Sequence, residues 1–236
     1  METRLLHTDT PESPSLSVAI DEAILDEVTR GFSPQTLRFF RCERAVFIGK
    51  SNTIEESIDM DVARKNNVSV ARRFFESEAS YHDIGVLNFS FIANTSALGN
   101  DLSSAFSTMV QCTANALKEP GVELDVASSL ILLDGNKVFD SRITAIRGAM
   151  LFAGFVFIDS DTDLHQSVLR KRGLDSAMSA PANIGSVSKR TAEDIRRAIS
   201  DSFAKDLGTE YVMAGLTEDE LAITDRIQWK RHEKLL

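Results

Sequence analysis

The order of hydrophobic patterns along the chain is the feature that most constrains its fold. Apolar residues recur at helical spacing in several segments, and short runs typical of β-strands lie between them in irregular order. A doubly wound parallel sheet would need regular strand–helix alternation, which this order lacks. We therefore predict an α+β fold with mixed and antiparallel sheets packed against helices. The expected helices span residues 16–28, 59–66, 101–118, 191–207 and 217–231, and the expected strands span residues 37–41, 45–49, 68–72, 85–92, 130–133, 137–139 and 150–158.

Capping and turn signals indicate where several of these elements begin and end. Ser13-Pro14 is a typical helix start, and Gly31 follows the last apolar residue of the first helix. Thr191–Asp194 fits a helix cap followed by acidic residues in the first turn. Asp134-Gly135 lies between two strand-like runs and predicts a hairpin, because both residue types tolerate the left-handed backbone that such turns need.

The composition is that of a soluble globular protein. Hydrophobic residues make up 43% of the 236 residues and charged residues 26%. No apolar run reaches the ~20 residues that span a bilayer. Cys42 and Cys112 do not make a disulfide framework, and no secretory signal follows Arg4. We therefore expect a cytoplasmic protein that is not bound to a membrane.

The net charge of −9 argues against a nucleic-acid partner, because such binders usually carry a basic face. The one short basic run, Arg170–Arg172, is interpreted as a solvated turn. No interdomain linker or internal repeat interrupts the chain. We predict one domain over residues 1–207, followed by a C-terminal helical extension over residues 208–236.

The segment over residues 72–83 carries the most chemistry. It reads Arg-Arg-Phe-Phe-Glu-Ser-Glu-Ala-Ser-Tyr-His-Asp. The segment resembles the signature of lipoate-protein ligases, in which two arginines precede a Ser or Thr, three glycines, Ala, a small residue, an aromatic residue, His and Asp. The resemblance implies the catalytic-domain fold of biotin and lipoate protein ligases. It also implies that an acyl-binding pocket is lined by Arg72, Arg73, Tyr81, His82, Asp83 and Asn88.

The middle of this segment departs from the signature. Phe75 stands where the family has a hydroxyl residue, and Glu76, Ser77 and Glu78 stand where it has glycines. Glycines let the backbone adopt positive φ and bring N–H groups close to an anion. A carboxylate ~4 Å from a phosphate charge would repel it by ~4 kcal/mol at an effective dielectric constant of 20. The segment therefore predicts a degenerate loop that disfavours an acyl-adenylate.

A second stretch, Lys137–Arg142, resembles the family's catalytic-lysine pattern of Lys, a hydrophobic residue, Ser, Gly, Ser and Ala. By this resemblance Lys137 is the catalytic residue, because a compact ammonium stabilises charge on the acyl carbonyl and phosphate. Phe139, Asp140 and Arg142 replace the first Ser, the Gly and the Ala. Two further nucleotide-site motifs are also replaced, by Ser128-Ser129 and by Phe152–Phe155. The pocket is accordingly expected to be acidic, or plugged by Phe74, Phe75 and Phe139.

The resemblance supports two main hypotheses. The first is a degenerate homologue that does not form lipoyl-AMP and binds an acyl group, a lipoyl domain or a partner ligase. The second is an active ligase or octanoyltransferase that attaches the acyl group to a lipoyl-domain lysine. A sensor of acyl metabolites is a third. The ligand would be lipoate or octanoate, with ATP and Mg only in the active case. The protein partner would be a lipoyl-domain protein, such as E2 or the glycine-cleavage H protein, or a ligase subunit that supplies the missing accessory domain.

Other chemistry is weakly represented. The four histidines have no metal-ligand spacing, so no metal site is predicted. Asp159, Asp161 and Asp163 lack the glycine and terminal Glu of a calcium loop, and are interpreted as a capped turn. Cys112 lies on the apolar face of a predicted helix and is expected to pack there as a small hydrophobic residue.

Overall fold

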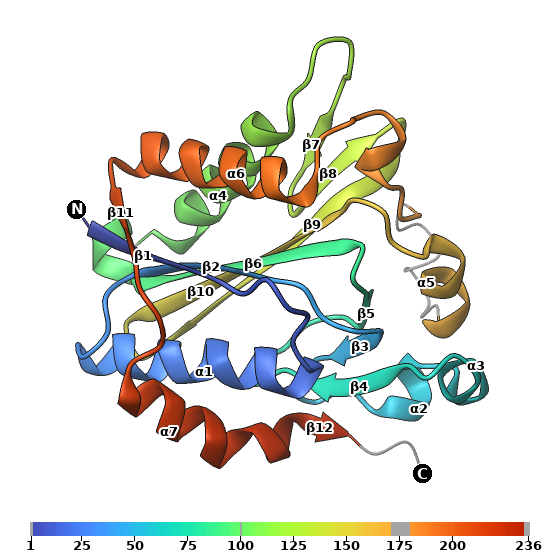
Figure 1. Cartoon of the computed structure of the whole chain (residues 1–236), viewed down its shortest axis with the longest axis horizontal. Coiled ribbons are helices and arrows are strands. Elements are labelled where there is room, and N and C mark those ends of the chain that lie inside the picture. The colour runs from blue at the N-terminus through green and yellow to red at the C-terminus, as the bar shows by residue number, and fades with distance from the viewer. Residues whose placement is uncertain (1, 100, 171–179, 234–236) are drawn as a thin grey trace.

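Two mixed β-sheets and the helices around them make up the fold (Figure 1). The computed structural model describes residues 2–99, 101–170 and 180–233. Lys171 and Arg172 of the predicted basic turn lie outside these residues. The larger sheet has eight strands in the order β11-β1-β2-β6-β10-β9-β8-β7. They are β1 (Glu2–His7), β2 (Thr36–Phe40), β6 (Val86–Asn94), β7 (Asp125–Ala127), β8 (Leu130–Leu133), β9 (Asn136–Ile146), β10 (Ala149–Phe157) and β11 (Glu210–Met213).

Both faces of the larger sheet are covered, which explains its nearly continuous apolar strands. On one face, α4 (Leu102–Leu117) and α6 (Ala192–Leu207) pack over phenylalanines that include Phe89 and Phe152. On the other face lies α1 (Pro14–Arg30), with α7 (Glu218–Ile227) packed against it (Figure 1). The α+β prediction is confirmed.

The smaller sheet has four strands in the order β12-β4-β3-β5. They are β3 (Ala45–Ile48), β4 (Ser69–Arg72), β5 (Ser80–His82) and β12 (His232–Glu233). Its outer face packs against three short helices, α2 (Ile54–Ser57), α3 (Met60–Lys65) and α5 (Thr162–Val168). Single 3-10 turns span Thr95–Leu98, Ile184–Ser186 and Gln228–Arg231.

Helix α1 joins the two sheets. Val18 near its N-terminus packs with Phe47 and Ala71 of the smaller sheet. Ile24, one turn and a half later, packs with Leu151 of the larger sheet. The space where the two sheets approach each other is therefore bounded by the middle of α1.

The predicted local signals agree with the structure at several points. Gly31 ends α1 in the left-handed conformation with φ 78°, and Thr191 and Asp194 form a capping box on α6. Asp134 and Gly135 both have positive φ in the β8–β9 turn, at 50° and 77°. Asp161 caps α5, as the capped-turn interpretation expects.

The helix expected over residues 217–231 is shorter than predicted. It ends at Ile227, and the following 3-10 turn buries no side chain. Without an apolar stripe to hold another α-helical turn, the chain bends into β12, which pairs antiparallel with β4. Residues 208–233 thus hold two strands besides α7, and the domain boundary at residue 207 stays a prediction. Within the described residues, no helix combines the length and apolarity that a bilayer crossing requires.

Candidate functional site

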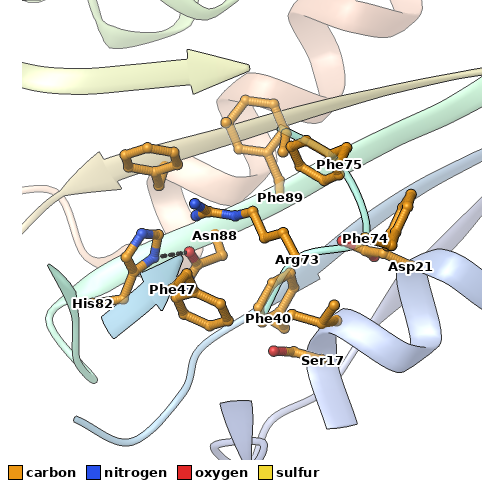
Figure 2. A pocket seen from close by; sticks show the side chains of 14 residues that line it. Ser17, Asp21, Phe40, Phe47, Arg73, Phe74, Phe75, His82, Asn88 and Phe89 are labelled. Carbon is orange, nitrogen blue, oxygen red and sulfur yellow. Dashed lines mark hydrogen bonds between the residues drawn. The ribbon is translucent and has the colours of Figure 1, made fainter. Parts of the chain in front are cut away.

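A small cavity lies between the two sheets, under the segment that joins β4 to β5 (Figure 2). Its volume is about 40 Å³. Pockets that bind small molecules are typically ~300–1,000 Å³, so an eight-carbon acid fits only if neighbouring side chains move. Six phenylalanines dominate its wall, and Ser17, Asp21, Arg73, His82 and Asn88 supply the polar groups. The phenylalanines are Phe40, Phe47, Phe74, Phe75, Phe89 and Phe155.

Arg73 is the central polar residue of this cavity (Figure 2). Its guanidinium donates hydrogen bonds to the hydroxyls of Ser77 (3.0 Å) and Ser80 (2.9 Å), and lies 5.1 Å from the Phe47 ring centroid. No carboxylate lies within ion-pair distance of it among the described residues. Burial, followed by the nearby Arg142, lowers the pKa of Arg73 to about 9. The cavity therefore contains a buried cation without a direct counter-ion.

His82 is held by hydrogen bonds at both ring nitrogens. Its Nε2 lies 2.8 Å from the Ser80 hydroxyl and its Nδ1 lies 2.5 Å from Oδ1 of Asn88 (Figure 2). Burial, followed by the charge of Arg73, holds the pKa of His82 well below its usual range. His82 is therefore a neutral residue in a fixed orientation near neutral pH, and it lines the same cavity as Arg73 and Asn88. The acyl-binding role of these residues stays a prediction.

Three other predicted pocket residues point elsewhere. Strand alternation turns Tyr81 away from His82 and into the apolar cluster of the smaller sheet. The Asp83 carboxylate accepts hydrogen bonds from the Gly85 amide, the Ser160 hydroxyl and the Asp161 amide. These bonds fix the β5–β6 turn against the end of β10.

Arg72 has a structural position as well. It donates to the carbonyl oxygens of Gly49, Lys50 and Asn52, at 3.2, 3.1 and 2.7 Å. These bonds hold the turn after β3, on which the β4–β5 segment rests. Neither Arg72, Tyr81 nor Asp83 lines the cavity.

The predicted degenerate loop has an ordinary backbone. Glu76, Ser77 and Glu78 all lack positive φ, so this conformation does not need glycine. Glu76 accepts a hydrogen bond from the Ser51 hydroxyl (2.7 Å) on the outer side of the loop, and Glu78 lies 3.4 Å from Arg142. Neither Glu76 nor Glu78 lines the cavity. Phe75 instead points inward and packs on α1.

Lys137 begins a row of alternating charges. It is buried at the start of β9, and its Nζ lies 3.3 Å from Oδ2 of Asp140. The other Asp140 oxygen accepts a hydrogen bond from Arg142, which reaches Glu78. The order is therefore Lys137, Asp140, Arg142, Glu78, and we call it the charge row. Three of its four residues stand where the resemblance expects Gly, Ala and Gly.

The expected plug is only partly present. Phe74 and Phe75 line the cavity, whereas Phe139 lies on the opposite face of the larger sheet, 6.1 Å from Phe89 between ring centroids. Strand alternation along β9 explains this, because it places Asp140 and Phe139 on opposite faces. Lys137 is not itself a lining residue, and backbone hydrogen bonds with Ala180 and Ala182 run alongside it.

Other reactive groups do not assemble into a second site. No cluster of three or more His, Cys, Asp or Glu residues suited to a metal ion occurs in the described part of the chain. Burial raises the pKa of the Cys112 thiol to about 12, and the thiol donates to Asp206 on α6. Cys42 is also fully buried, and burial raises its pKa. Neither cysteine is poised as a thiolate nucleophile.

Some site residues escaped the sequence analysis. Asp21 and Ser17 reach the cavity from α1, and Phe40, Phe47 and Phe155 from three strands. Their sequence signal is that of core residues, since each lies in an amphipathic or apolar run. The ion pair between Glu78 and Arg142 has no local sequence signal, because its partners are 64 positions apart.

Comparison with known proteins identifies a matching protein family and several similar proteins. The family model described as "Lipoyl protein ligase A/B catalytic domain" matches residues 13–204. Lipoate-protein ligase A subunit 1 of Thermoplasma acidophilum is 30% identical over 98% of this chain and 94% of its own length. Octanoyltransferase LipM of Brevibacillus brevis is 24% identical over 93% of this chain and 92% of its own length.

Solved structures agree with these matches. The T. acidophilum protein Ta0514, a putative lipoate protein ligase with bound lipoic acid, has a TM-score of 0.85 at 28% identity, covering 98% of this chain and 96% of that chain. A second structure, of a bi-partite lipoate protein ligase and its E2 lipoyl domain from T. acidophilum, has a TM-score of 0.85 at 28% identity, covering 98% and 93%. A lipoate-protein ligase A bound with ATP has a TM-score of 0.84 at 28% identity, covering 98% and 95%.

Proposed function

Because the chain belongs to the lipoyl protein ligase A/B catalytic-domain family, we propose that it acts in protein lipoylation without forming an acyl-adenylate. It binds the acyl group, lipoate or octanoate, together with a lipoyl domain or a partner ligase subunit. A similar subunit in T. acidophilum belongs to a bi-partite ligase described with its E2 lipoyl domain, which supports this choice of partners.

The charge row is the observation that carries the proposal. The Lys137 ammonium, which would contact the adenylate phosphate, has the buried Asp140 carboxylate 3.3 Å away. A phosphate on that ammonium would lie ~4–6 Å from the carboxylate. Two negative charges at that distance repel by ~3–4 kcal/mol at an effective dielectric constant of 20, which corresponds to a factor of ~100–1,000.

The loop over residues 76–78 supports the same conclusion. Its ordinary backbone and three side chains do not offer the close N–H donors that a glycine loop gives to a phosphate. The apolar cavity and the polar group of Arg73, His82 and Asn88 persist beside it. These features support acyl recognition without nucleotide chemistry at this site.

The test is ATP–pyrophosphate exchange in the presence of Mg²⁺ and either lipoate or octanoate. The unmodified chain is expected to show no exchange above background, while an active family ligase serves as the positive control. A triple variant, Glu78→Gly, Asp140→Gly and Arg142→Ala, returns the family's residue types at three of the replaced positions and asks whether exchange appears. Robust exchange by the unmodified chain would contradict the proposal.

An active ligase or octanoyltransferase is the second candidate. The intact hydrogen-bonded set of Arg73, Ser80, His82 and Asn88 favours it, since this set would orient an acyl group whether or not it is activated here. Transfer of a lipoyl or octanoyl group to a lipoyl domain is the test, with Lys137→Ala as the control. Only the ligase form of this candidate needs ATP and Mg, because an octanoyltransferase takes its acyl group from an activated thioester. A transfer activity that ignores Lys137→Ala would contradict the candidate.

A further inference from the structure

We propose that Arg142 recognises the carboxylate of the acyl ligand, and that Glu78 occupies Arg142 while the cavity is closed. The inference rests on the acyl-binding part of the proposed function. Arg142 would be a specificity-determining residue that selects an apolar carboxylic acid over an uncharged analogue. Glu78 would be an internal carboxylate that such a ligand displaces.

Arg142 lies at the edge of the cavity. It pairs across the sheet with Ala153 of β10, which lines the cavity wall. The nearby positive charge of Arg142 contributes to the lowered pKa of the buried Arg73. The side chain of Arg142 is 17% exposed, so part of it is accessible without unfolding of the strand.

The two carboxylates that flank Arg142 differ in how firmly they are held. Asp140 is 1% exposed and accepts hydrogen bonds from Arg142, from Lys137 and from the Ser141 amide. Glu78 is 54% exposed and lies 3.4 Å from Arg142 at its nearest oxygen. An ion pair this exposed is weak and screened by salt. Asp140 thus orients the guanidinium, and Glu78 is the partner that can exchange.

Once Glu78 leaves, an incoming carboxylate replaces its charge beside Arg142, whereas a phosphate on Lys137 would add negative charge beside Asp140. The three cations Lys137, Arg73 and Arg142 then face the single fixed carboxylate of Asp140. Asp21 also lines the cavity, but its carboxylate already accepts from Arg38 (2.6 Å) and Ser90 (2.8 Å). A ligand carboxylate would restore the lost negative charge beside Arg142.

The same ion pair also bears on the size of the cavity. Glu78 belongs to the segment that carries Phe74 and Phe75 over the 40 Å³ space. The backbone carbonyl of Glu78 accepts from Arg73 at 3.4 Å, so the segment is tied to the cavity floor by Arg73 and to β9 by Glu78. Release of Glu78 would remove the tie to β9 and let the two rings move outward.

Calorimetric titration with octanoate and with octanamide tests the inference. We expect Glu78→Gln to tighten octanoate binding about fivefold, because the internal competitor is weakened. We expect Arg142→Gln to weaken octanoate binding about tenfold or more. Octanamide binding should change by less than about twofold in both variants. Glu76→Gln is the matched control, because it removes the same charge from the same loop without touching Arg142.

Arg142→Lys is included in case Arg142→Gln fails to fold. It keeps the positive charge and loses only the bidentate geometry of the guanidinium. It should recover part of the octanoate affinity. Three results would overturn the inference: an octanoate affinity that ignores Arg142→Gln and Arg142→Lys, a weaker octanoate affinity in Glu78→Gln, or no octanoate binding by any of the folded proteins. None of these bears on ATP–pyrophosphate exchange, so the adenylation part of the proposed function stands or falls separately.

Discussion

Asp140 is the residue whose loss should most disturb the site. Its buried carboxylate faces both Lys137 and Arg142. Asp140→Asn removes the negative charge at nearly constant side-chain shape and leaves Lys137 and Arg142 without this counter-ion. Breaking a buried pair in this way typically destabilises by ~3–5 kcal/mol. We expect a loss of that size in the free energy of unfolding, measured by urea denaturation. The double variant Lys137→Met, Asp140→Asn should be less destabilised than the single one, and a loss below ~1 kcal/mol in the single variant would show that the pair is not effectively buried.

His165 gives the stability of the fold a defined dependence on pH. Burial, followed by the charge of Lys137, lowers its pKa to about 3, against ~6.5 in an unfolded chain. Between those values the unfolded chain binds a proton that the folded chain excludes. Stability is therefore fully present above pH ~6.5 and falls as the pH drops towards 3, by ~1 kcal/mol per pH unit between pH 6 and 5. When the free energy of unfolding is measured by urea denaturation at several pH values, its slope against pH should be shallower by this amount in His165→Gln. The exposed His232→Gln is the control, and parallel profiles for His165→Gln and the unmodified chain would refute the prediction.

The position of a site residue could be predicted from the sequence where its neighbours in the chain determine it. It could not be predicted where a partner distant in the sequence determines it. Arg73, His82 and Asn88 line one cavity, and their acyl-binding role stays a prediction. Tyr81 does not line this cavity, because strand alternation separates adjacent residues, and the start of β5 could not be fixed from a three-residue strand. Glu76 and Glu78 were expected to oppose a phosphate directly. Their side chains turn to Ser51 and Arg142, which a reader of the sequence could not foresee.

At the scale of elements, the turn after β3 supports the segment that closes the cavity. A Cβ atom at Gly49 would lie 2.3 Å from the Ser77 carbonyl oxygen and 2.4 Å from Oδ1 of Asn52. Gly49→Ala must therefore displace the segment, and crowding of this kind typically costs ~1–3 kcal/mol. We expect that loss of stability together with faster hydrogen exchange at residues 74–78. Gly215→Ala is the matched control, because nothing lies within 4 Å of its added Cβ. Unchanged exchange at residues 74–78 in Gly49→Ala would contradict this account.

Long elements were predictable where burial imposes a regular period on them. Strand β9 was not, because its second half is only partly buried, and it runs to Ile146 although a strand was expected only over residues 137–139. Helix α4 and strand β10 each bury a repeated apolar pattern, and both were expected within a residue or so of their bounds. Strands β1, β5 and β12 were missed, and so were β7 and β11. Strands β7 and β11 both lie at the edges of the larger sheet with mainly exposed residues, so their backbone pairing leaves no hydrophobic pattern in the sequence.

At the scale of the whole molecule, the two ends of the described chain hold each other in place. Strand β11 pairs parallel with β1, and α7 packs against α1. Arg4 on β1 donates to both oxygens of Glu220 on α7, at 2.7 and 2.6 Å, and both side chains are buried. The segment after residue 207, expected from the sequence to be an extension, thus carries part of the buried structure.

Two variants and a control should measure that contribution. A chain that ends at Leu207 would leave Arg4 without its carboxylate partner and expose the α1 surface under α7, so we expect it to lose cooperative unfolding or to aggregate. Glu220→Gln keeps the segment and removes only the charge, and should cost ~3 kcal/mol in urea denaturation. Glu22→Gln breaks the more exposed pair with Arg231 and should cost less than ~1 kcal/mol. A soluble chain of residues 1–207 with an unchanged unfolding midpoint would instead support a domain that is complete without the C-terminal segment.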